Sequence, residues 1–329
     1  MRYSFCPWNC ATTMCSIGKV APMALGQSDV AISPALTTGK IATNRHKLVR
    51  LSVVGQVTSP RYPPPPANPY RISIHGEPMV LPGTGGVTYN IRIGHRVQDI
   101  VGDHVEPAVT MKNPDENANG GLNILACIGN RASILSGGAA GSTGVVTGKH
   151  GGAEHVMVDF AFDVLERMVP GDKILVKSFG TGLELEGLPD VKCMSIDPDF
   201  FDAWINEIRG GKLVVPVTHR IPAGVMGSGL GRDNAYRGDY DITMFDEATV
   251  KEYGLDTLRL GDIVAIVDAD STYGRYYHQG SVTIGIIAHG DSIIAGHGPG
   301  VTCLLSSRLG AIDPTIDPNA NIGSILGLI

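Results

Sequence analysis

The sequence predicts a mainly β protein of barrel or sandwich architecture with a few short helices. Glycine and proline account for 43 and 21 of the 329 residues, and this excess favours short strands joined by tight turns. Short alternating or apolar runs, such as residues 47–57 and 281–288, are typical of strands. The few helical patterns do not alternate with the strands, which argues against a doubly wound α/β sheet.

The composition excludes several kinds of partner. Hydrophobic residues make up 43% of the chain and charged residues 18%, which is typical of a globular protein. The net charge is −6, and without a basic run we expect neither nucleic acid nor an anionic membrane surface as a partner. No apolar run is as long as a membrane span, and no segment has the pattern of a signal peptide. We therefore expect a cytoplasmic protein.

We divide the chain into three parts. Residues 1–44 have weak periodicity and form an N-terminal extension, residues 45–168 an N-terminal β domain, and residues 169–329 a C-terminal domain that contains a β-barrel. We expect a homo-oligomer, because contacts between subunits can cover the edge strands of so large a β protein.

The six cysteines fall into two groups. Three lie singly in apolar runs and are interpreted as core residues. The other three lie in the extension at a spacing that matches no common zinc pattern, so we favour a poorly structured segment, with a metal or cluster site as the alternative. The first group is Cys127, Cys193 and Cys303, and the second is Cys6, Cys10 and Cys15.

The expected elements follow the chain in order. Residues 59–70 contain a proline run that is expected to be extended. Helices are expected at residues 159–168, 197–208 and 245–254, with Asp197 and Asp246 as caps and Gly254 as a stop. VPGDKILV and RLGDIVAI form a weak repeat in which a Gly-Asp turn precedes a strand. The remaining strand-like segments are residues 70–75, 87–93, 122–128, 131–136 and 144–147.

Two short clusters could carry chemistry. Asp103, His104 and Glu106 are three polar side chains in four positions, and they are the candidate catalytic residues, with a polar turn as the alternative. His150, Glu154 and His155 surround a Gly-Gly turn, and imidazole and carboxylate groups are ligands for a divalent metal. A polar strand–turn connection is the other interpretation of this second cluster.

Two longer segments are candidates for binding a small-molecule ligand. Residues 219–240 hold glycines whose bare amides suit an anion and arginines that suit a carboxylate or phosphate. A surface loop or an oligomer contact is the alternative. Residues 277–301 place imidazoles at the ends of a strand and on a glycine-rich loop. The candidate substrate-binding residues are Arg220, Gly227, Gly229, Arg232, His289 and His297.

Several long motifs resemble the DUF4438 family of bacterial and archaeal proteins. They are HRIPAGVMGSGLGRDNAYRGDYDI, LRLGDIVAIVDAD and TIGIIAHGDSIIAGHGPGVT, together with LNILACIGN and TGKHGGAEHVMVDF in the first half. The resemblance runs from about residue 44 to the C-terminal region. It implies a mainly β, multi-domain architecture with a small barrel, and it implies no activity.

Two hypotheses about function remain. The first is a metal-assisted hydrolase of a small polar amide or cyclic amide, with a bound water as nucleophile. The second is a non-catalytic oligomeric protein that binds a small molecule or has a structural role. The hydrolase is favoured if the histidines and acids near residues 103–106, 150–155 and 289–297 meet in one pocket, and the second hypothesis is favoured if they scatter.

Overall fold

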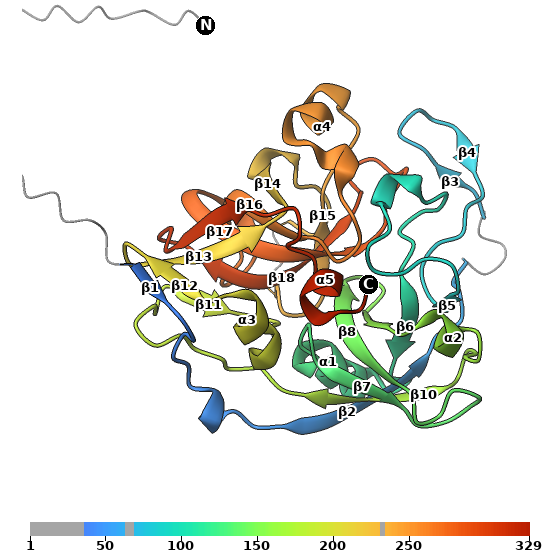
Figure 1. Ribbon diagram of the computed structural model, residues 1–329. Coiled ribbons are helices and arrows are strands. Elements are labelled where there is room, and N and C mark those ends of the chain that lie inside the picture. The colour runs from blue at the N-terminus through green and yellow to red at the C-terminus, as the bar shows by residue number, and fades with distance from the viewer. Residues whose placement is uncertain (1–35, 63–68, 231–233) are drawn as a thin grey trace, which may run out of the picture. The chain divides into compact units, whose positions relative to one another are not determined.

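Seven strands form an antiparallel sheet, and six of them close into a barrel (Figure 1). The strand order is β2-β10-β7-β8-β9-β6, and β6 pairs back with β2, so the ring has no free edge. The strand β5 extends the sheet beside β6. The strands are β2 (Leu51–Val57), β5 (Val87–Thr88), β6 (Ala108–Lys112), β7 (Arg131–Ile134), β8 (Thr143–His150), β9 (His155–Asp159) and β10 (Lys173–Ser178).

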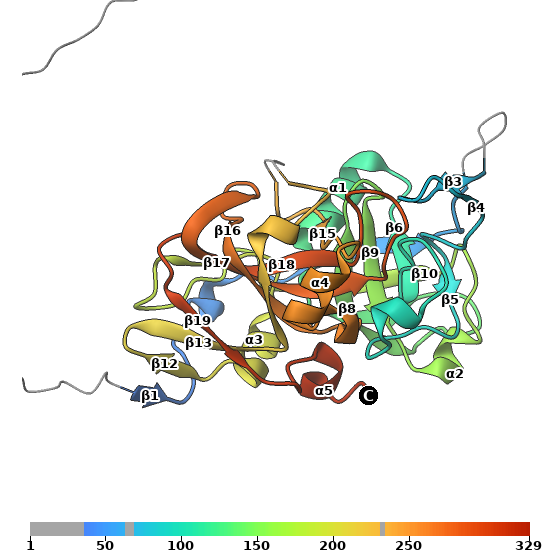
Figure 2. The same cartoon turned by 90° about the horizontal axis from the view of Figure 1, so that it is seen from above.

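A second sheet lies beside the barrel, as Figures 1 and 2 show from two directions. Its order is β11-β18-β17-β16-β14, and β15 also pairs with β18. Strand β8 of the barrel packs against β17 and β18, and both faces of its last seven residues are therefore buried. The strands are β11 (Val191–Cys193), β14 (His219–Pro222), β15 (Asp239–Asp241), β16 (Ile263–Asp270), β17 (Tyr276–His289) and β18 (Gly300–Ser307).

Two smaller sheets complete the strands. One has the order β1-β12-β13-β19 and the other is the pair β3-β4. These strands are β1 (Leu36–Thr38), β12 (Glu207–Arg209), β13 (Lys212–Val217), β19 (Ile312–Ile316), β3 (Arg71–Ile72) and β4 (Pro78–Met79). The predicted mainly β class with a barrel and a few short helices is confirmed.

The helices are short and lie around the sheets. The predicted caps of α3 and α4 are confirmed: Asp197 accepts from the amides of Asp199 and Phe200, and Asp246 accepts from the amide of Thr249. Gly254 ends α4 with φ 65°. The helices are α1 (Glu116–Leu125), α2 (Phe162–Leu165), α3 (Pro198–Trp204), α4 (Glu247–Tyr253) and α5 (Ile322–Leu326). The 3₁₀ helices are η1 (Arg45–Lys47), η2 (Val97–Asp99), η3 (Ala223–Val225) and η4 (Leu255–Thr257).

One predicted strand is wrong. The sequence predicts a strand at residues 122–128, but residues 122–125 belong to α1. The helix is capped by Asp115, whose side chain accepts from the amide of Ala118. A short apolar run fits a buried helix face as well as a strand, so its pattern does not separate the two.

The repeated Gly-Asp turn has the same hydrogen bonds in both copies. Asp172 donates its amide to the Val169 carbonyl and accepts the Val169 amide at its side chain, over 3.2 and 3.0 Å. Asp262 and Arg259 make the same pair at 3.0 and 2.9 Å. The glycine at the third position has positive φ in each copy, as this turn requires. Each turn starts a central strand, β10 or β16.

The computed structural model describes residues 36–62, 69–230 and 234–329. The cysteines of the extension, the middle of the proline run and Arg232 lie outside these residues. The buried apolar side chains of the described parts form one continuous cluster that joins the barrel to the second sheet. The six barrel strands lie between residues 51 and 178, so the barrel is not in the predicted C-terminal domain, because β10 pairs back with β2 and β7. The boundary at residues 168 and 169 stays a prediction. No helix in the described ranges combines the length and the apolar character needed to span a membrane.

Candidate metal centre

Six side chains from distant parts of the chain meet where the barrel touches the second sheet. His150 ends β8, Asp239 and Asp241 lie on β15, and His289 ends β17. The other two come from loops: His104 precedes β6, and His297 lies between β17 and β18. They form two triplets of potential metal ligands, each with ligand atoms within 4.8 Å of one another.

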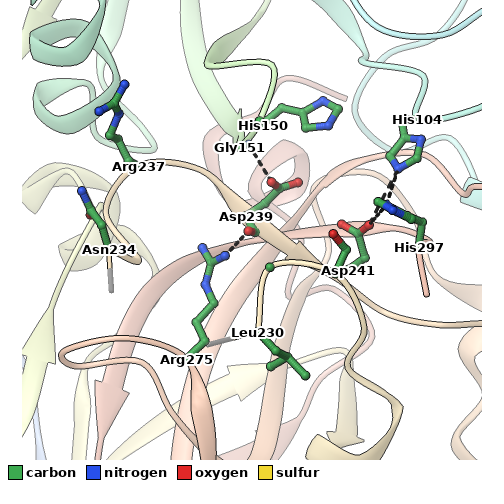
Figure 3. Close-up of a pocket in the computed structure, with 13 residues that line it drawn as sticks. His104, His150, Gly151, Leu230, Asn234, Arg237, Asp239, Asp241, Arg275 and His297 are labelled. Atoms are coloured by element: carbon green, nitrogen blue, oxygen red, sulfur yellow. Dashed lines mark hydrogen bonds and ion pairs between the residues drawn. The ribbon is translucent and has the colours of Figure 1, made fainter. Parts of the chain in front are cut away.

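The first triplet consists of His104, Asp241 and His297. The Nδ1 atom of His297 lies 2.9 Å from Oδ2 of Asp241 and 3.1 Å from Nε2 of His104. Nε2 of His104 is 3.7 Å from the same carboxylate oxygen. Figure 3 shows these three side chains pointing toward one another at one end of a cavity.

The second triplet consists of His150, Asp239 and His289, and all three are buried. Nε2 of His289 lies 2.7 Å from Oδ2 of Asp239, yet neither atom has a hydrogen-bond partner among the described residues. Nδ1 of His289 lies 2.9 Å from the Gly290 carbonyl, which only accepts, so Nδ1 carries the proton. A lone pair on Nε2 then faces a carboxylate. Two acceptors at this distance require a cation between them, either a second proton or a metal ion.

Gly300 makes this approach possible. It is paired with His289 on one side and with Asp241 on the other. A Cβ atom at Gly300 would lie 2.1 Å from Nε2 of His289 and 2.2 Å from Oδ2 of Asp239. Any other residue would therefore separate the two ligand atoms.

The two triplets adjoin each other. The ring of His104 is centred 5.2 Å from that of His289 and 5.7 Å from that of His150. The two aspartates are at positions i and i+2 of β15, so their side chains lie on one face of the strand. The two sets of potential ligands therefore lie side by side.

Carboxylates behind the imidazoles orient them. Oδ1 of Asp103 is 3.3 Å from Nδ1 of His104, and Oε1 of Glu106 is 2.7 Å from Nδ1 of His150. A carboxylate that accepts from one ring nitrogen leaves the other nitrogen free to bind a metal, a common arrangement around ligating histidines. Glu106 also contacts Nδ1 of His155 at 3.0 Å.

The pKa values in the cluster reflect the close contacts between its carboxylates and its imidazoles. Burial lowers the pKa of His104, but the carboxylates of Asp103 and Asp241 outweigh this and raise that pKa to about 9. Burial raises the pKa of Asp103, but His104, Ser292 and Arg71 together lower it to about 2. In Glu106, Asp239 and Asp241 the neighbouring histidines likewise overcome burial and lower the pKa. The cluster therefore favours bound positive charge.

The candidate residues from the sequence occupy different places in this centre. His104 and His150, together with His289 and His297, supply four of the six potential ligands, whereas Asp103, Glu106 and His155 lie behind them. Glu154 is turned outward with φ 60° and pairs with Arg237 over 2.8 Å. Asp239 and Asp241 are not among the candidate residues from the sequence, although their i, i+2 spacing in RGDYDI indicates one face of a strand.

The predicted binding loop has a packing role that its glycines explain. The Gly227 amide donates to the Asp241 carbonyl over 2.8 Å, and the Ser228 amide donates to the Gly296 carbonyl over 2.6 Å. A Cβ at Gly227 would lie 2.1 Å from that Gly296 oxygen. Arg220 donates to the Pro314 carbonyl and does not line the cavity. The loop thus ties β15 to the segment that carries His297.

The centre opens on a cavity of about 290 Å³. His104, His150, His297 and both aspartates form one part of its wall. The backbone around Gly229 and the side chains of Asn234, Arg237 and Arg275 form another part (Figure 3). The three segments named in the sequence analysis therefore converge at one concave site, although His289 itself lies behind its wall.

Comparison with known proteins identifies the family. The N-terminal domain of unknown function DUF4438 matches residues 70–202, and the C-terminal domain of the same family matches residues 203–326. The crystal structure of TM1086 is similar, with 43% sequence identity and a TM-score of 0.82, over 87% of this chain and 99% of that one. No curated protein matches the chain. The chain belongs to the DUF4438 family.

Proposed function

We propose that this protein is a metal-dependent hydrolase that acts on a small polar amide or cyclic amide. The observation that carries the proposal is the contact between Nε2 of His289 and Oδ2 of Asp239. These two buried atoms lie 2.7 Å apart with no hydrogen bond of standard geometry, so a second proton or a metal ion must lie between them. A divalent ion bound by both would satisfy them, with His150 as the third ligand.

The donor set suits catalysis better than a purely structural ion. Imidazole nitrogen with carboxylate oxygen is a ligand set for zinc and for other first-row divalent metals. Three protein ligands leave coordination positions open, as in catalytic sites, whereas structural zinc sites are usually closed by four protein ligands. The three potential ligands of the first triplet face the cavity, where a substrate has access.

A divalent ion in such a site lowers the pKa of a bound water and polarises a carbonyl group. In amide hydrolysis the water oxygen attacks the carbonyl carbon, the C–N bond then breaks, and the amine leaves with a proton. The chain's own contribution is to fix the ligands: Asp103 and Glu106 hold the imidazoles, and Gly300 leaves room for the second triplet. The location in the cell and the homo-oligomer stay predictions.

The test begins with the metal content of protein purified without a histidine tag. We expect near-stoichiometric zinc, manganese, iron or cobalt, lost in both H289A and D241N and retained in H46A, which changes an exposed histidine. The loaded protein is then assayed against linear and cyclic amides. No bound metal, or metal content equal in all variants, would overturn the metal centre. Metal without hydrolysis of any amide would favour a non-catalytic binding protein.

A further inference from the structure

Arg275 is a buried arginine in the cavity wall that has no acidic partner among the described residues. Its residue exposure is 2%, and it lines the cavity. One guanidinium nitrogen, Nη1, donates to the main-chain carbonyl of Asp239. Nε and Nη2 are buried and have no hydrogen-bond partner. A buried charge with two unsatisfied donors is costly unless something binds to it.

The guanidinium is held in a fixed plane. It stacks on the ring of Tyr240, with the central carbon 4.3 Å from the ring centre. This cation–π contact offsets part of the cost of burial, because a desolvated cation is attracted to the face of an aromatic ring. Gly229, which has φ 85°, packs against the guanidinium, and a Cβ there would lie 3.0 Å from Nη1. The arginine is therefore oriented before any ligand arrives.

The position of Arg275 relates it directly to the metal centre. It binds the main-chain oxygen of Asp239, while the side chain of Asp239 belongs to the second triplet. Figure 3 shows the guanidinium beside Asp239, with His104 and His297 farther along the wall. Asp239 thus fixes the distance between the unpaired donors of Arg275 and the potential ligand atoms of the second triplet.

A second arginine lies in the wall of the same cavity, where a carboxylate balances its charge. Arg237 lines it and pairs with Glu154 through Nε and Nη2, over 2.9 and 2.8 Å. Guanidinium groups bind two oxygens of one anion through parallel N–H groups, so carboxylate and phosphate are the anions that fit. A volume of about 290 Å³ restricts the ligand to a small molecule.

We infer that the substrate of this cavity is a small molecule with an anionic group, a carboxylate or a phosphate, that binds Arg275 while the group to be cleaved faces the two triplets. This inference rests on the proposed hydrolase and adds a substrate class to it. Arg275 thus has the role expected of Arg220, which does not line the cavity.

The test measures binding by calorimetry to the metal-loaded protein. The probes are succinate, inorganic phosphate and the neutral succinamide. We expect succinate or phosphate to bind at least tenfold more tightly than succinamide, and this comparison needs no variant. The stronger of the two anions identifies the carboxylate or phosphate class. Equal binding of succinamide and both anions would overturn the inference.

Variants separate Arg275 from the metal, which can itself bind anions. R275Q should weaken anion binding at least tenfold, R275K should weaken it less, and R220Q should leave it unchanged. Metal content, measured on the same samples, should be the same in all of them. Unchanged anion binding in R275Q would refute the role of Arg275. If the protein holds no metal but still binds the anions through Arg275, the proposed function fails and the anion site stands.

Discussion

Replacing Glu106 with glutamine tests how the cluster is held together. The carboxylate is 1% exposed and accepts from four groups. Oε2 accepts from the Gly85 amide at 2.6 Å and the Thr110 hydroxyl at 2.8 Å. Oε1 accepts from Nδ1 of His150 at 2.7 Å and of His155 at 3.0 Å. Glutamine has the same shape but only one accepting oxygen.

The less costly orientation of the glutamine in E106Q keeps its oxygen toward Gly85 and Thr110, because the Gly85 amide can only donate. The side-chain NH₂ then faces His150, which must accept at Nδ1 and carry its proton on Nε2, whereas His155 can still donate to the retained oxygen, which lies 3.1 Å from its Nδ1. Two charge-assisted bonds become neutral ones, at about 1 kcal/mol each, so we expect a loss of about 2 kcal/mol of unfolding free energy. His150 also loses the lone pair that would bind a metal. Disturbed ligand orientation of this kind typically costs 10–100-fold in metal affinity, or about 1.4–2.7 kcal/mol.

Urea denaturation of chelator-treated protein measures the first effect, and competition with a metal-indicator dye measures the second. The matched control is E252Q, which makes the same change at an exposed position of α4. Surface substitutions of this kind usually stay within about 0.5 kcal/mol of wild type. If E106Q were as stable as E252Q and bound metal as tightly, the reasoning about Glu106 would be refuted.

Three further predictions concern the scaffold. Gly261→Ala should lower the free energy of unfolding more than Gly171→Ala. Both glycines have positive φ, and an alanine in that conformation costs about 1–2 kcal/mol at either position. Only at Gly261 would the new Cβ also clash, because it would lie 2.7 Å from Ile93. Equal costs in urea denaturation would contradict this. Asp246→Ala should lower the denaturation midpoint because α4 loses its N-cap, and an unchanged midpoint would argue against that role. Iodoacetamide should label the buried thiols only in urea, because they are inaccessible in the native protein and burial raises the pKa of two of them, one to about 12. Equal labelling of these thiols in native protein, measured by mass spectrometry, would contradict this prediction. These thiols are Cys127, Cys193 and Cys303.

Many elements of the fold could be predicted from local sequence patterns. The caps of α3 and α4 and the repeated Gly-Asp turn act within a few residues, so their chemistry is visible in the sequence. The apolar run in α1 carried no such signal, because Gly120 and Gly121 weaken its helical appearance and its length suits a strand as well.

The pairing of residues in the site was harder to predict, because it depends on contacts across the sheet. The i, i+2 spacing of Asp239 and Asp241 also occurs at Asp268 and Asp270. Asp268 has φ 62° at an irregularity in the pairing of β16 with β17, so these two acids do not follow a regular strand. Asp239 and Asp241 do alternate regularly, as their spacing indicates, but the pairing with β18 that brings His289 and His297 beside them cannot be read from the sequence.

Each triplet draws one residue from before β9, one from β15 and one from position 289 or later. During synthesis on the ribosome, neither triplet can therefore be complete until almost the whole chain has emerged. A nascent chain that ends before residue 289 offers only two ligands of each set, which are too few to hold an ion firmly. A metal ion would thus bind only after both halves of the chain have folded. Its ligands would then link segments up to 193 positions apart. The bound ion would stabilise the finished fold only at the last stage of its assembly.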